Sequence, residues 1–137
     1  MRALLLALGL LAGAAQAGEP APALLARAQA GDGQAAYRLG LMARHGEGVA
    51  RNAALAARWM EQAAGARLPQ AMFTLSNMLM AGEGVARDEA AARYWLEQAA
   101  ELGHPAALQE LALREPDPQK AELLMRQAAH ALQHTSN

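Results

Sequence analysis

One block of this sequence occurs twice, 36 residues apart. Residues 46–51 read Gly-Glu-Gly-Val-Ala-Arg, and the same six residues return at 82–87. When residues 31–66 are aligned with residues 67–102, 17 of the 36 positions are identical. A period between about 20 and 50 residues is typical of solenoids, in which each repeat is one supersecondary unit packed on its neighbours. The chain is therefore predicted to be a repeat protein.

Each copy has the pattern of two helices joined by a glycine loop. The glycines end the first helix, because glycine adopts backbone angles that other residues avoid. Asn52 and Asp88 are suitable N-cap residues for the second helix. Each second helix carries one Trp on its apolar face, which we expect to anchor the core. The residues with a structural role in the repeat are Gly46, Gly48, Val49, Trp59, Gly82, Gly84, Val85 and Trp95.

These positions resemble the Sel1-like repeat (SLR) family, whose members are relatives of the tetratricopeptide repeats. The family pattern is Ala-x-x-x-Leu-Gly, Gly-x-Gly-Val, an Asn or Asp, Ala-x-x-Trp and an Ala-Ala pair. The first copy matches it with Ala35, Leu39, Gly40, Gly46, Gly48, Val49, Asn52, Ala56, Trp59, Ala63 and Ala64. The second copy departs from it at Ser76, which replaces the Gly after Leu. The resemblance implies an all-α fold, a short right-handed α-solenoid of antiparallel helix pairs, in a member without cysteines.

The rest of the chain predicts the ends of this solenoid. The two full repeats span about 31–66 and 67–102, and a truncated third spans about 103–132. The third copy lacks seven residues, including the glycine loop, and restarts at Asp117 followed by Pro118, a suitable helix start. Residues 22–30 match only a second helix and are expected to cap the stack. The repeat domain is thus placed at 18–132, with a disordered tail at 133–137.

Residues 1–17 have the features of a cleavable signal peptide. Arg2 gives the positive start, an apolar run extends from Leu4 to Ala14, and Ala15-Gln16-Ala17 gives the small-x-small cleavage pattern. We expect cleavage after Ala17 and a periplasmic or secreted mature protein. No second hydrophobic segment follows, so no stable membrane insertion is expected after cleavage. The chain contains no Cys, so neither a disulfide nor a lipid anchor on Cys is available.

The sequence offers no set of residues typical of catalysis or of a cofactor. Thr74 and Ser76 lie on a helix without a recognisable base, and we interpret Ser76 as a small packing residue. His130 and His134 are four residues apart, a weak metal signature, and we interpret them as exposed histidines. We therefore predict no catalytic site, no metal site and no cofactor. Formal net charge is −1 and no basic block occurs, so nucleic acid is not expected as a partner.

The surface of the first helices is the predicted partner-binding site. In solenoids of stacked helix pairs, an extended concave surface commonly holds a partner, and the first helices are expected to line it. The positions on these helices that the repeat pattern does not fix are Arg38, Leu41, Arg44, His45, Thr74, Asn77 and Met80. The mixture of polar and apolar side chains suits an adaptable protein interface. An ordinary solvated helix face remains the alternative interpretation.

The sequence favours a non-catalytic, monomeric scaffold or adaptor of the bacterial cell envelope that binds another protein. The resemblance also allows a periplasmic antagonist of a toxin. A third hypothesis is a binder of a small ligand or cell-wall fragment, but disulfide-bearing members of that kind have a Cys pair in each repeat. The identity of the partner does not follow from the sequence.

Overall fold

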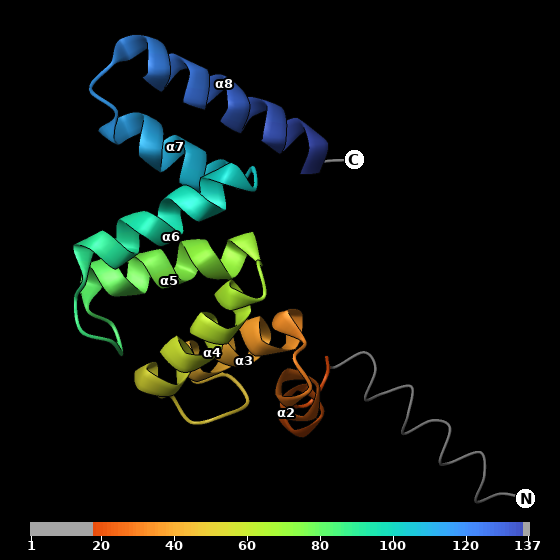
Figure 1. The fold of residues 1–137 in the computed structure, drawn as a ribbon. Helices are drawn as coiled ribbons and strands as arrows, with labels where there is room; N and C mark the ends of the chain where they lie inside the picture. The colour runs from red at the N-terminus through yellow and green to blue at the C-terminus, as the bar shows by residue number, and fades with distance from the viewer. Residues whose placement is uncertain (1–17, 136–137) are drawn as a thin grey trace, which may run out of the picture.

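The computed structural model of this protein describes residues 18–135, which form seven helices and no strand. The helices are α2 (Ala21–Gln29), α3 (Gly33–His45), α4 (Ala53–Gly65), α5 (Pro69–Ala81), α6 (Glu89–Glu101), α7 (Pro105–Arg114) and α8 (Pro118–Thr135). The pairs α3–α4, α5–α6 and α7–α8 are helical hairpins that follow one another along one array (Figure 1). The prediction of an all-helical solenoid of antiparallel helix pairs is confirmed.

The two ends of the array differ from the repeats between them. Helix α2 has no first helix of its own and packs on α3, as expected of a capping half-repeat. Helix α8 continues to Thr135, whose hydroxyl donates to the carbonyl of Leu132 at 3.0 Å. The expected disordered tail is therefore wrong for residues 133–135, which are helical. The signal peptide at 1–17 and residues 136–137 lie outside the described residues.

Short local signals set where the helices begin. The carboxylate of Asp32 accepts hydrogen bonds from the backbone N–H groups of Gln34 and Ala35, at 3.0 and 3.2 Å. Asn52 and Asp88 cap α4 and α6 in the same manner, each at 3.0 Å. Such caps satisfy N–H groups that have no partner within the helix. The first residues of α5, α7 and α8 are prolines, whose missing N–H costs nothing at that position.

The core is built mainly from alanine. Of the 23 buried hydrophobic residues, 15 are Ala, so the helices meet through methyl groups and their axes lie close together. Larger side chains fill the remaining gaps, and the fully buried ones are Leu24, Met60, Leu75, Met78 and Leu96. Gly40 is part of this close packing, because an added Cβ would lie 2.7 Å from the terminal methyl group of Met60. Helices α3 and α4 of the first repeat therefore lie at short separation.

The two Trp residues lie at the edge of this core. Trp59 and Trp95 pack against it but are only partly buried, whereas the residues that follow them, Met60 and Leu96, are buried. An indole is too large to enter fully between helices spaced by alanine, and Trp is rarely buried completely. The Trp residues, predicted as anchors, thus pack on the edge of the core, whereas Met60 and Leu96 lie inside it. Val49 and Val85 are partly buried against the same core.

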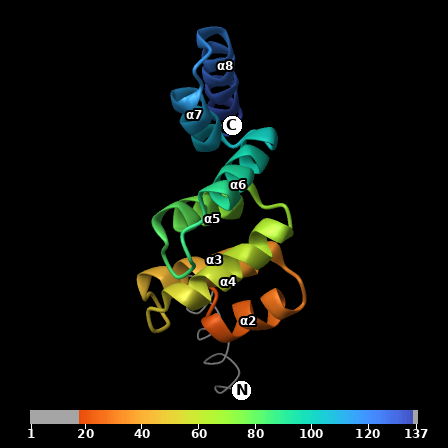
Figure 2. The same ribbon diagram turned by 60° about the vertical axis from the view of Figure 1, so that its left-hand side comes forward.

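The glycine loop of the second repeat contacts the first repeat directly. Gly82 and Gly84 have φ angles of +68° and +70°, in the left-handed region that favours glycine. A Cβ on Gly84 would lie 2.1 Å from the carbonyl oxygen of Ala53, at the first residue of α4. In Figure 2 this loop extends from the α5–α6 hairpin toward the α3–α4 hairpin. Gly84 thus allows a backbone-to-backbone contact between repeats.

The two equivalent loop glycines allow a matched stability test. Gly48 has almost the same φ, +73°, but a Cβ there would meet only the terminal methyl group of Met42, at 3.0 Å. We expect Gly48→Ala to lower the free energy of unfolding by about 1–2 kcal/mol, the cost of the left-handed conformation. We expect Gly84→Ala to lower it by at least about 3 kcal/mol, because the clash with Ala53 is added. Urea unfolding followed by circular dichroism measures both, and equal losses would contradict the contact described here.

Candidate partner-binding face

Residues 36 positions apart occupy equivalent places on the first helices of the three repeats. Leu41 of α3, Asn77 of α5 and Leu113 of α7 therefore form one row along the array. Leu41 and Asn77 are half-buried, whereas Leu113 is 79% exposed and is the most exposed large hydrophobic residue of the described chain. We call this row and its exposed neighbours Arg38 and His45 the first-helix face. It presents apolar and polar groups side by side.

A second row on the same helices consists of Arg38, Thr74 and Glu110. The side chain of Arg38 is 60% exposed, and its guanidinium lies 4.0 Å from the carboxylate of Glu19. Thr74 is buried, and its hydroxyl donates to the carbonyl of Gln70 at 2.8 Å. The expectation that Thr74 contacts a partner is therefore wrong. Glu110 pairs with Arg114 one turn further along α7.

Arg44 links two repeats. Its Nε lies 2.6 Å from one carboxylate oxygen of Glu83, and a terminal guanidinium nitrogen lies 3.2 Å from the other. The two-point geometry orients α3 against the glycine loop of the next repeat, and both side chains are about two-thirds buried. Arg44, which was predicted to bind a partner, thus contacts Glu83 within the protein. Met80, at the equivalent position of α5, is half-buried.

His104 has a structural role between the second and third repeats. Its ring stacks on Phe73 with centroids 4.9 Å apart, and its Nδ1 accepts a hydrogen bond from the backbone N–H of Ala107 at 3.3 Å. Accepting this bond requires an unprotonated Nδ1, and burial lowers the pKa of the imidazole below its ordinary value of 6.5. The neutral form of His104 therefore caps α7.

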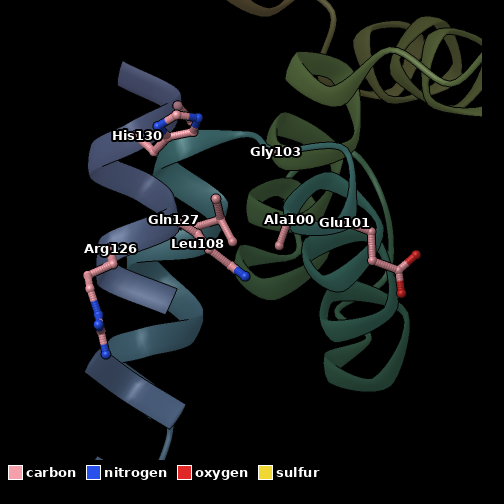
Figure 3. Close-up of a pocket in the computed structure, with 8 residues that line it drawn as sticks. Ala100, Glu101, Gly103, Leu108, Arg126, Gln127 and His130 are labelled. Carbon is pink, nitrogen blue, oxygen red and sulfur yellow. The ribbon is translucent and has the colours of Figure 1, made fainter. Parts of the chain in front are cut away.

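One pocket lies between the α6–α7 turn and α8. It encloses about 650 Å³ and is lined by Ala100, Glu101, Gly103, Leu108, Arg126, Gln127, His130 and Ala131. Figure 3 shows Gln127 and Leu108 beside the gap between α8 and α6, while Glu101 points away from α8. A second pocket of about 470 Å³ lies between α6, α7 and α8, on the truncated repeat.

One hydroxyl in the described chain has a structural partner. The buried hydroxyl of Ser76 donates to the carbonyl of Ala92 at 2.7 Å, so it stabilises the α5–α6 hairpin. No group of three or more His, Cys, Asp or Glu side chains in this part of the chain could hold a metal ion. No helix in the same range is long and apolar enough to cross a membrane.

Sequence reasoning missed Leu113 because it treated the third copy only as a cap. The signal was present, since Leu111 is in register with Leu75, and the same offset of 36 places Leu113 beside Asn77. Of the seven predicted partner-binding residues, the structure leaves Arg38 and His45 exposed on one side of the array. Leu41, Asn77 and Met80 are half-buried along it, and Thr74 and Arg44 serve internal contacts.

Comparisons with known proteins agree with this architecture. A model of the Sel1 repeat family matches residues 33–66, 69–104 and 109–131. A Sel1 repeat protein from Oxalobacter formigenes is 29% identical, with a TM-score of 0.70 over 74% of this chain and 44% of that one. The protective antigen c5321 of uropathogenic Escherichia coli, with an SLR fold, is 29% identical, with a TM-score of 0.68 over 75% of this chain and 24% of that one.

A third solved structure extends the comparison. Helicobacter pylori cysteine rich protein B (hcpB) is 26% identical, with a TM-score of 0.59 over 61% of this chain and 63% of that one. The present chain therefore spans less than half the length of the first two structures and less than two thirds of the third. No curated protein matches the chain significantly.

The cap formed by His104 predicts a dependence of stability on pH. Because the pKa of His104 is lowered by folding, the unfolded chain binds the proton more readily, and the contribution is present above pH 6.5 and lost as pH falls through the folded pKa. His104→Asn should remove this part of the pH dependence, since Asn caps a helix without titrating. Urea unfolding at pH 7.5 and pH 5.0 measures the difference, and an unchanged pH dependence in the variant would contradict the assignment.

Proposed function

Because this chain belongs to the Sel1 repeat family, whose members are generally scaffolds for protein–protein interaction, we propose that it is a non-catalytic adaptor that binds another protein through its first-helix face. The proposed partner offers a loop or a single helix. The first helices of the described array offer a short face, and we propose an interface at or below standard size.

The observation that carries the proposal is the exposure of Leu113. The side chain of Leu113 on α7 is 79% exposed. When a partner covers it, the free energy falls by about 25 cal/mol for each Å² of apolar surface removed from water. Leu113 lies in register with Leu41, and Arg38 and His45 border the row with polar groups. An apolar centre with a polar rim is the arrangement of protein interfaces.

The polar contacts of the structure also support a non-catalytic role. The hydroxyls of Thr74 and Ser76 donate hydrogen bonds to main-chain carbonyls, and the imidazole of His104 accepts one at the start of α7. These groups stabilise helices and hairpins, so the side chains that resemble catalytic groups in the sequence have structural partners. Recognition of another protein requires no such group, because a few buried side chains supply most of the binding energy.

We place the adaptor in the bacterial cell envelope. The support is the leader at residues 1–17, with its positive start, apolar run and cleavage pattern.

Export is tested on the protein recovered from a periplasmic or culture fraction. We expect intact-mass spectrometry to give a chain that begins at Gly18, because cleavage follows Ala17. A recovered protein that retains Met1 would contradict the signal-peptide assignment. The result is independent of where a partner binds.

Binding at the first-helix face is tested by site-specific photo-crosslinking in the source cells. A photo-reactive residue at His45 should give a defined protein adduct, whereas one at Arg58, exposed on the second helix α4, should give none. The double variant Arg38→Glu and Leu113→Glu should reduce the His45 adduct by roughly tenfold or more, since each tenfold loss corresponds to 1.4 kcal/mol. Equal adducts at both positions, or an undiminished adduct in the double variant, would refute the proposed face.

The double variant leaves the fold intact if the assignment is right. Arg38 and Leu113 are exposed, so their replacement should change the helical circular dichroism signal and the free energy of unfolding little. Arg44 is not used in this test, because its reversal would break the contact with Glu83 and mix binding with stability. An adduct that contains a toxin domain or a cell-wall fragment would change the class of partner.

A further inference from the structure

The last helix brings two histidine side chains into contact. His130 and His134 of α8 are exposed, and their Nε2 atoms lie 3.1 Å apart. Their ring centroids are 4.4 Å apart and the rings meet edge to face, at 75°. His130 also borders the 650 Å³ pocket, where Figure 3 shows its imidazole at one end of the gap beside α8. The pair therefore lies at an accessible position.

The helix fixes the spacing of the pair. Residues four apart lie one above the other on the same face of an α-helix. The two histidines can lie on one face only if α8 is helical through residue 134. Helix α8 continues to Thr135. The sequence interpretation placed His134 in a disordered tail, which would have separated the two rings. The structure instead places both rings on one turn of helix.

The two nitrogens lie at hydrogen-bond distance, and the same distance fits two ligands of one metal ion. An imidazole nitrogen binds a divalent transition ion at about 2.0–2.1 Å. Two nitrogens on one ion at angles between 90° and 109° are then roughly 2.9–3.4 Å apart. The observed 3.1 Å falls within this range. Both rings are exposed, so a small rotation can direct both lone pairs to one point.

We propose that His130 and His134 form a two-histidine site for a late first-row divalent transition ion, with water in the remaining coordination positions. Imidazole suits Cu²⁺, Ni²⁺ and Zn²⁺, whereas Mg²⁺ and Ca²⁺ require oxygen ligands. Cu²⁺ binds tightest, by the general order of affinity of nitrogen sites. The site is open, since the described chain supplies no third His, Cys, Asp or Glu ligand.

The metal site is separate from the first-helix face. The pair lies on α8, the second helix of the truncated repeat, whereas Leu113 and Arg38 lie on the first helices α7 and α3. Loss of metal binding would thus leave the proposed adaptor function unaffected, and loss of partner binding would leave the metal site in place. The two proposals fail or hold independently.

The site is tested by isothermal titration of the full exported protein with CuCl₂, and separately with NiCl₂ and ZnCl₂, in a buffer that does not bind metals. We expect one saturable Cu²⁺ site per chain and weaker Ni²⁺ and Zn²⁺ binding. His130→Gln and His134→Gln should each weaken Cu²⁺ binding at least tenfold. His45→Gln is the matched control for Cu²⁺ binding, because His45 is exposed on α3 without a second His one turn away. It should leave the Cu²⁺ affinity unchanged.

A spacing variant separates chelation from mere histidine content. Combining His134→Gln with Leu132→His keeps two histidines on α8 but moves the second to the opposite side of the helix. This variant should bind Cu²⁺ as weakly as His134→Gln, and the electron paramagnetic resonance spectrum of the unaltered protein should show two coordinated nitrogens. The proposal would be overturned if the spacing variant bound Cu²⁺ as tightly as the unaltered protein, or if the unaltered protein had no saturable site. A change of Cu²⁺ affinity in His45→Gln would also overturn it.

Discussion

The close approach of alanine-lined helices is the interaction on which the rest of this structure depends. Ala side chains bury little surface each, so the array is stable only if many of them meet at short separation. Gly40 lets Met60 enter between the helices of the first repeat, and Gly84 lets the loop of the second repeat reach the backbone of α4. A larger residue at either position would separate elements that alanine brings together.

Side-chain contacts across the boundaries fix the orientation of one repeat on the next. Arg44 binds Glu83 across the first boundary, and Gln62 donates to the carbonyl of Ala28, 2.5 Å away, across the boundary with α2. At the last boundary, Phe73 stacks on His104. Each link joins residues from different repeats. These side chains therefore serve to assemble the array.

The seven-residue deletion in the third copy changes the surface of the molecule. Without the glycine loop, the shorter link at Glu115 and Pro116 borders a pocket together with Arg93 of α6. A pocket of about 470 Å³ lies between α6, α7 and α8, and Leu113 at the end of α7 stays exposed. The third copy thus supplies surface features that the two complete copies lack, and both the proposed partner contact and the proposed metal site include it.

The sequence by itself determined the architecture, because the period of 36 residues, the loop glycines and the helix caps are local signals that recur in each copy. It also indicated which helices come first in each pair. It did not determine the roles of Arg44, Thr74 and the Trp residues, since these depend on contacts with residues far along the chain: Arg44 and Glu83 are 39 positions apart. Exposure of Leu113 and the meeting of His130 with His134 were likewise decided by tertiary structure, through what packs on α7 and how far α8 continues. Local residue spacing specifies where the helices begin and end, but the packing between repeats decides which side chains remain exposed to a partner.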